Sequence, residues 1–139
     1  MRDPTQPILD TLHRNLQSIW DSDAETYRAT TADDVSFFEW YISPQRIDGL
    51  DFHLRELRVH TAVVTGGVDP AREGEGRVEH ELLQPRVQLY GDTAVVAFRL
   101  LGQAASADAT EYLNTGTFVR RDDGWRAVAW QATRVPQRE

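Results

Sequence analysis

The chain has 139 residues, of which 40% are hydrophobic and 27% are charged, a size and balance typical of one globular domain. Its formal net charge of −7 argues against nucleic acid and anionic membranes as partners, because both bind basic surfaces. The sequence has no cysteine, which excludes disulfides and thiolate chemistry, and no apolar run that predicts a signal peptide or a membrane span, so we expect a cytoplasmic protein.

The first part of the chain is predicted to be mainly helical. Apolar residues spaced by three and four predict a helix over residues 7–21. A short second helix is expected over residues 24–30, with Tyr27 facing the core. Residues 35–42 are rich in β-formers and predict a strand, whereas apolar residues at helical spacing predict a helix over residues 49–61.

The second part of the chain is dominated by predicted strands, which follow a polar, glycine-rich loop at residues 66–76. Residues 77–90 predict a long strand. Within it, Pro85 marks a bulge, a bend or an edge position, because proline cannot donate a ladder hydrogen bond. Residues 86–101 and 116–135 each contain a glycine turn between two β-rich runs, which predicts two antiparallel hairpins.

Helices followed by a run of strands indicate the α+β class. We expect a cone-shaped, strongly curved antiparallel sheet wrapped on the N-terminal helices. A single domain of this kind would span residues 1–139, with flexible ends at residues 1–6 and 136–139.

The most apolar strand, within residues 93–101, would present apolar side chains on both of its faces. Val96, Phe98 and Leu100 point to one side, opposite to Arg99. We expect the helices to cover the Arg99 side, so Val96, Phe98 and Leu100 should form an interface with a second copy. The alternative is a cover within one chain, made by the C-terminal tail with Phe118, Trp125 or Trp130.

Arg99 is the one charged residue in this apolar strand. A guanidinium in such surroundings requires a counter-charge, a water-filled cavity or an anionic ligand, and two of these give specific interpretations. The first interpretation makes Arg99 a clamp for a small carboxylate. The second makes it the partner of an acidic side chain, with Glu39, Asp51 and Glu111 as candidates.

Four short segments together resemble one known family. They are DGLDFH at residues 48–53, PRVQLYGD at 85–92, AFRLLGQ at 97–103 and RRDDGW at 120–125. The pattern resembles the association (hub) domain of calcium/calmodulin-dependent protein kinase II, in the nuclear-transport-factor-2-like superfamily (also SnoaL-like or cystatin-like). The resemblance runs over residues 7–135, and we expect a free-standing, bacterial relative.

The resemblance implies a non-catalytic module that assembles with itself, as a homodimer or a ring of dimers. It also implies a polar internal pocket, in which His53 matches the family histidine and Arg99 the first pocket arginine. Gly116 and Ala132 stand where the family has two further arginines. We therefore expect a ligand pocket, with a small carboxylate as the candidate ligand, lined by His53, Arg99, Tyr27, Trp40 and Tyr112.

Related cones include ketosteroid isomerases, polyketide cyclases and dehydratases, which suggests an alternative function as a small-molecule enzyme. Such enzymes pair a carboxylate or histidine base with a hydrogen-bond donor such as tyrosine. The candidate bases here are Asp51 and His53, and the candidate donors are Tyr27, Tyr41 and Tyr112. Neither a metal ion nor a cofactor is expected, because no spacing brings enough ligands together.

Overall fold

The computed structural model describes residues 3–40, 42, 44–64, 78–104 and 110–136. The predicted loop at residues 66–76 and the candidate donor Tyr41 lie outside the described residues. The elements in chain order are α1 (Gln6–Trp20), α2 (Ala24–Ala29), β1 (Thr31–Phe38), β2 (Arg46–Asp48), α3 (Asp51–Val64), β3 (Val78–Tyr90), β4 (Thr93–Ala104), β5 (Thr110–Arg121) and β6 (Gly124–Arg134).

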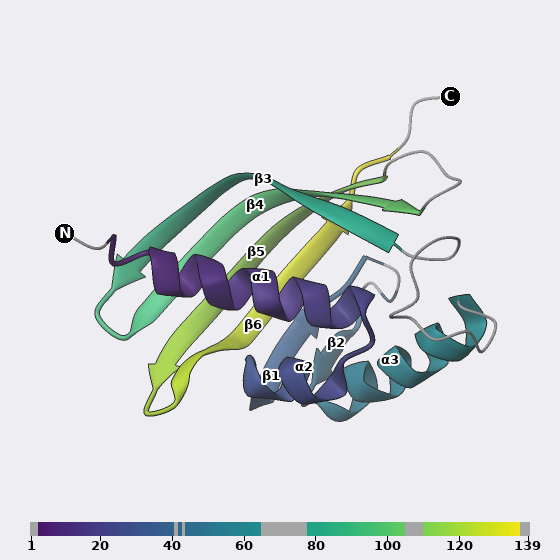
Figure 1. The fold of residues 1–139 in the computed structure, drawn as a ribbon, viewed down its shortest axis with the longest axis horizontal. Coiled ribbons are helices and arrows are strands. Elements are labelled where there is room, and N and C mark those ends of the chain that lie inside the picture. The colour runs from purple at the N-terminus through teal and green to yellow at the C-terminus, as the bar shows by residue number, and fades with distance from the viewer. Residues whose placement is uncertain (1–2, 41, 43, 65–77, 105–109, 137–139) are drawn as a thin grey trace.

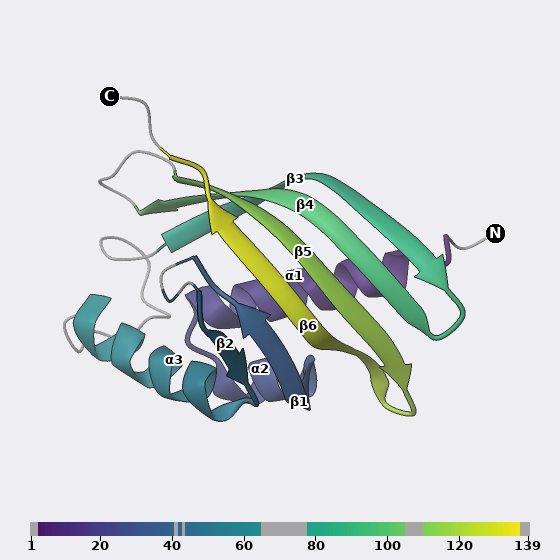
Figure 2. The ribbon, with the colours of Figure 1, turned by 180° about the vertical axis from the view of Figure 1, so that it is seen from behind.

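The described strands form one sheet in the order β2-β1-β6-β5-β4-β3. The long strands β3 to β6 are antiparallel neighbours, whereas β1 runs parallel to β6. The sheet curves around α1, which crosses one of its faces (Figure 1). Seen from behind, the opposite face, called the outer face from here on, has no described helix in front of it (Figure 2). The predicted α+β fold with a curved sheet is confirmed.

Local sequence explains most of these elements. Pro85 interrupts the ladder as expected, because the register between β3 and β4 shifts between Leu83 and Arg86 and Gln84 has a positive φ of 51°. β3 is also the last strand of the sheet, so the missing N–H faces no further strand. Gly91 and Gly124 adopt φ values of 61° and 122° at the two hairpin turns.

The core lies between α1 and the inner face of the sheet. Ile8, Leu12 and Leu16 of α1 pack in one buried cluster with the inward side chains of β4, β5 and β6. A second cluster joins α3 to α2 and β1, and it contains Tyr27, which is 2% exposed as the sequence predicted. These two clusters leave the outer face without a partner from the described helices.

The prediction that Val96, Phe98 and Leu100 form an interface with a second copy is wrong. All three belong to the cluster beneath α1, and they are 0%, 5% and 7% exposed. The alternative of a cover within one chain is confirmed in part, because Phe118, Trp125 and Trp130 pack in this cluster, but α1 completes the cover in place of the C-terminal tail. The sequence-based assignment reversed the two faces of β4, and the side of Arg99 is the one that faces outward.

Candidate functional site

The candidate site is a partly enclosed cavity of about 340 Å³ on the inner side of the sheet. We call it the internal cavity. Its walls come from α1, α2 and α3 and from the inner faces of β1, β4, β5 and β6. A volume of this size is within the lower range of small-molecule pockets. Four of the five predicted pocket residues line it, namely Tyr27, Trp40, His53 and Tyr112.

Strand alternation and helix spacing bring the polar side chains together. Glu39 follows β1 at the same parity as the buried Phe37, so its carboxylate points inward. His53 and Glu56 are three residues apart on α3 and therefore share a side of that helix. Asn114 points inward from β5, beside the outward Leu113.

His53 is the most constrained of these side chains. Its Nε2 lies 3.3 Å from Oε1 of Glu39, and both side chains are largely buried. The ring centroid is 3.9 Å from that of Phe37 and 6.1 Å from that of Tyr27. A hydrogen on Nε2 would face the Glu39 carboxylate, and in the neutral ring that arrangement would leave Nδ1 as an acceptor. Nδ1 is buried without a hydrogen-bond partner.

Tyr27 and Asn114 also leave polar atoms unsatisfied. Asn114 is 7% exposed, and its Oδ1 accepts a hydrogen bond of 2.8 Å from Nε1 of Trp130. Its Nδ2 and the hydroxyl of Tyr27 are buried and make no hydrogen bond of normal geometry. A buried polar group without a partner costs about 1–3 kcal/mol, so such groups around a cavity indicate that water or a ligand completes them.

The phenol of Tyr27 is held in its neutral form. Burial raises the pKa of this group above its ordinary value of 10.0, and the nearby Glu39 carboxylate raises it further. The hydroxyl of Thr31 opposes a part of this rise. In the unfolded chain the phenol ionises near its ordinary pKa, whereas in the folded chain it does not, so stability falls as the pH rises above that value.

This difference predicts the outcome of an ultraviolet titration of the folded protein. Tyr27→Phe should leave the amplitude of phenolate absorbance in the alkaline range unchanged, because Tyr27 does not ionise before the protein unfolds. Loss of amplitude in Tyr27→Phe would contradict the assignment.

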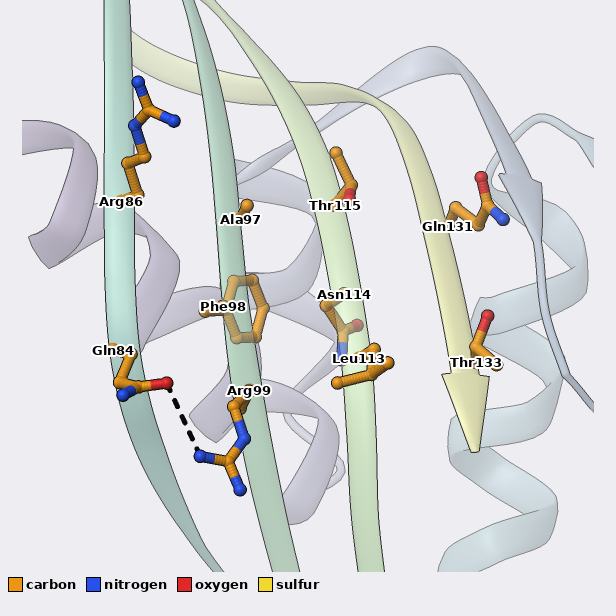
Figure 3. A pocket seen from close by; sticks show the side chains of 10 residues that line it. All are labelled: Gln84, Arg86, Ala97, Phe98, Arg99, Leu113, Asn114, Thr115, Gln131 and Thr133. Carbon is orange, nitrogen blue, oxygen red and sulfur yellow. Dashed lines mark hydrogen bonds between the residues drawn. The ribbon is translucent and has the colours of Figure 1, made fainter. Parts of the chain in front are cut away.

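Arg99, the fifth predicted pocket residue, does not line the internal cavity, so this prediction is wrong. It lies on the outer face of β4 and lines a different hollow of about 410 Å³ (Figure 3). Its guanidinium pairs with Glu111, and it donates a 3.4 Å hydrogen bond to Oε1 of Gln84. Glu111 is thus the counter-charge among the three acids considered, and it raises the pKa of Arg99 through a hydrogen bond and its charge. Arg99 therefore does not provide the predicted clamp for a small carboxylate in the internal cavity, because it lies outside that cavity and is paired with Glu111.

The remaining candidates are only partly placed. Asp51 is exposed in the first turn of α3 and does not line the internal cavity. The sequence interpretation missed Glu56 and Asn114 as cavity residues and considered Glu39 only as a partner of Arg99. A usable signal existed for Glu39, which is the single charge within the aromatic run at residues 37–41.

Two further properties bear on the class of site. Within the described ranges, no group of three histidine or acidic side chains is arranged to hold a metal ion. No described helix combines the length and the apolar character that crossing a membrane requires.

Comparisons with known proteins give one family and one fold. The model of the family described as calcium/calmodulin-dependent protein kinase II association domain matches residues 4–136. No curated protein matches the sequence. The hub of the S. rosetta kinase is 21% identical with a TM-score of 0.78, covering 97% of this chain and 99% of that one. The hub homology domain from Chlamydamonas reinhardtii is 22% identical with a TM-score of 0.79, covering 96% and 100%.

The same fold occurs beyond hub domains. A putative ketosteroid isomerase from Parabacteroides distasonis is 17% identical with a TM-score of 0.69, and the match covers 96% of this chain and 89% of that one. Identities at this level establish a shared nuclear-transport-factor-2-like fold, which many unrelated activities use. The role of the internal cavity has to be argued from its own residues.

Proposed function

This chain belongs to the calcium/calmodulin-dependent protein kinase II association domain family, and on that premise we propose that it is a non-catalytic self-association module. Two copies pair through the outer faces of their sheets, and larger rings are built from such pairs. The internal cavity of each copy holds a small molecule. The observation that carries the proposal is that no described helix covers the outer face, which exposes Phe38, Tyr90 and Leu113 among polar side chains.

Most of the large exposed apolar side chains of the described residues lie on this face. Four such side chains occur among the described residues, and Phe38, Tyr90 and Leu113 are three of them, at 47%, 65% and 46% exposure. The strand register places each of the three outward, opposite Gln131, Thr93 and Arg99 respectively. The fourth, Trp40, lines the internal cavity instead. Concentrated exposed apolar side chains are typical of protein–protein contacts.

The surface between these side chains suits another sheet. Ala97, Thr115 and Thr133 project from β4, β5 and β6 around the outer hollow, and all are short and uncharged (Figure 3). Short side chains let two sheets approach closely. The Arg99 charge in this region is already balanced by Glu111, so that guanidinium could be buried as an ion pair, whereas Arg86 at the edge strand β3 would have to stay in contact with water or find an acidic partner. A self-complementary pairing about a two-fold axis is the usual result.

Sedimentation velocity over a range of protein concentrations tests the proposal. We expect a dimer or a multiple of a dimer at micromolar concentration, because pairing would bury the exposed apolar side chains of the uncovered face. A protein that sediments as a monomer throughout that range would contradict it.

A second candidate function, proton transfer on a small molecule, is favoured by one observation. The internal cavity brings a histidine–carboxylate pair, His53 and Glu39, beside the neutral phenol of Tyr27. A base and a neutral donor are the groups that an isomerase of this fold requires. The two candidate functions differ in one measurable respect, because only proton transfer converts the bound molecule to a product.

A further inference from the structure

The charge balance of the internal cavity indicates which ligands it can take. Its lining residues include two carboxylates, Glu39 and Glu56, and no arginine. His53 is its single basic side chain and is already in contact with Glu39. A small carboxylate bound inside would meet two like charges in a poorly solvated space, which is strongly unfavourable.

The backbone around the cavity explains why no arginine occupies its wall on β5. Gly116 is the next buried residue of β5 after Asn114 on the same face of the strand, and a Cβ at this position would collide with the ring of Trp130, which lines the cavity. The indole therefore occupies the volume that a side chain would need. Ala132 is the corresponding small residue on β6, and it lines the cavity without adding charge. The nearest guanidinium on this strand, Arg134, lies over the ring of Trp40 and lines a neighbouring hollow.

The walls of the cavity are aromatic. Trp20, Trp40, Tyr112 and Trp130 line it together with Tyr27 and Phe37. The faces of such rings attract cations, most strongly where water is excluded. Trp40 already shows this behaviour, because the guanidinium carbon of Arg134 is 5.1 Å from its ring centroid. The ring of Tyr112 lies 6.0 Å from that of Trp40 and extends the aromatic wall.

The unsatisfied polar atoms complement the same kind of ligand. The hydroxyl of Tyr27 and Nδ1 of His53 make no hydrogen bond of normal geometry, and each can accept one, Nδ1 when the ring hydrogen is on Nε2. Tyr27 also senses both carboxylates, because Glu39 and Glu56 each raise the pKa of its phenol, after the larger effect of burial. An ammonium group would supply the missing donors and neutralise this field. Nδ2 of Asn114, a donor without an acceptor, would pair with a hydroxyl or carbonyl elsewhere on the ligand.

We propose that the internal cavity binds a small organic amine in its protonated form, with the ammonium group near Glu39, Glu56 and Tyr27 and the apolar part against the tryptophan rings. The proposal rests on the small-molecule role given to the cavity under the proposed function, but it does not depend on self-association. It names a class of ligand opposite in charge to the carboxylate that the sequence suggested.

A charge-matched series of probes tests this assignment in the unmodified protein. Phenethylamine, 2-phenylethanol and phenylacetate share a phenyl ring on a short chain and are cationic, neutral and anionic near neutral pH. Isothermal titration calorimetry should find the amine bound at least about tenfold more tightly than the alcohol, because of charge-assisted hydrogen bonds. Phenylacetate should bind most weakly. The proposal is overturned if phenylacetate binds as tightly as the amine, or if none of the three binds.

Variants locate the binding and separate this inference from the proposed assembly. Glu39→Gln and Glu56→Gln keep the shape of the side chain, and each should weaken amine binding about tenfold with little effect on the alcohol. Glu25→Gln and Arg99→Gln are the matched controls, since both residues lie outside the cavity, and they should change nothing. Unchanged amine binding in both cavity variants would refute the assignment. A monomer that still prefers the amine would contradict only the proposed self-association.

Discussion

Leu113→Glu is expected to convert the self-associated protein into monomers. Leu113 is 46% exposed on the outer face, beside Arg99 on β4 and Thr133 on β6. A carboxylate introduced there would be buried in the paired state close to its symmetry mate. Such a change within an interface costs about 3 kcal/mol or more of association free energy, which raises the dissociation constant about 100-fold or more. Sedimentation velocity of both proteins at the same concentrations measures the shift.

The control is His13→Glu, which adds a carboxylate to the exposed side of α1 at the opposite surface of the molecule. It should sediment as the unchanged protein does. Circular dichroism should show that Leu113→Glu keeps its secondary structure, because the substituted side chain is half exposed in a single copy. An unchanged oligomer in Leu113→Glu would exclude the outer face as the interface.

Phe98→Ala is expected to destabilise each protomer by about 3–5 kcal/mol, the usual cost of removing a buried aromatic side chain. Phe98 is 5% exposed, and its ring centroid is 5.8 Å from that of Trp130. Chemical denaturation measures the loss, and it should be carried out in the Leu113→Glu background. In that background unfolding should not be coupled to dissociation, so the two contributions to stability remain separate.

Val95→Ala is the matched substitution on the other face of the same strand. Val95 is part of the outward set and lies outside the core clusters, so its truncation should cost much less than that of Phe98. If Phe98→Ala instead kept the stability of the monomer and dissociated the native oligomer, the inward placement of this strand face would be refuted.

The sequence predicted the fold class well because its signals are local. Helical spacing, glycine turns and Pro85 each specify a conformation through residues close in sequence. The faces of β4 were a different problem. Alternation shows that Val96 and Phe98 share a side, but it cannot show which side α1 covers when Val95 and Ala97 are also apolar. That choice depends on tertiary packing.

The candidate site was predicted in part for the same reason. Tyr27 and His53 lie on helices with clear periodicity, and both reach the cavity. The partner of Arg99 depended on the register of β4 and β5, in which Leu101 lies opposite Glu111 and Arg99 opposite Leu113. The parallel pairing of β1 with β6 joins residues about ninety positions apart, and no local signal predicts it.

The contact between Gly116 and Trp130 constrains how this protein can evolve. A basic residue at position 116 would collide with an indole that Asn114 holds in place through a hydrogen bond. A descendant could acquire such a residue only after Trp130 had been exchanged for something smaller, and that first step alone would leave a void in the core. Adding a basic residue to the cavity at position 116 therefore requires two substitutions, and the protein that carries only the first of them would be less stable. We expect the charge of the internal cavity to change rarely in evolution for this reason.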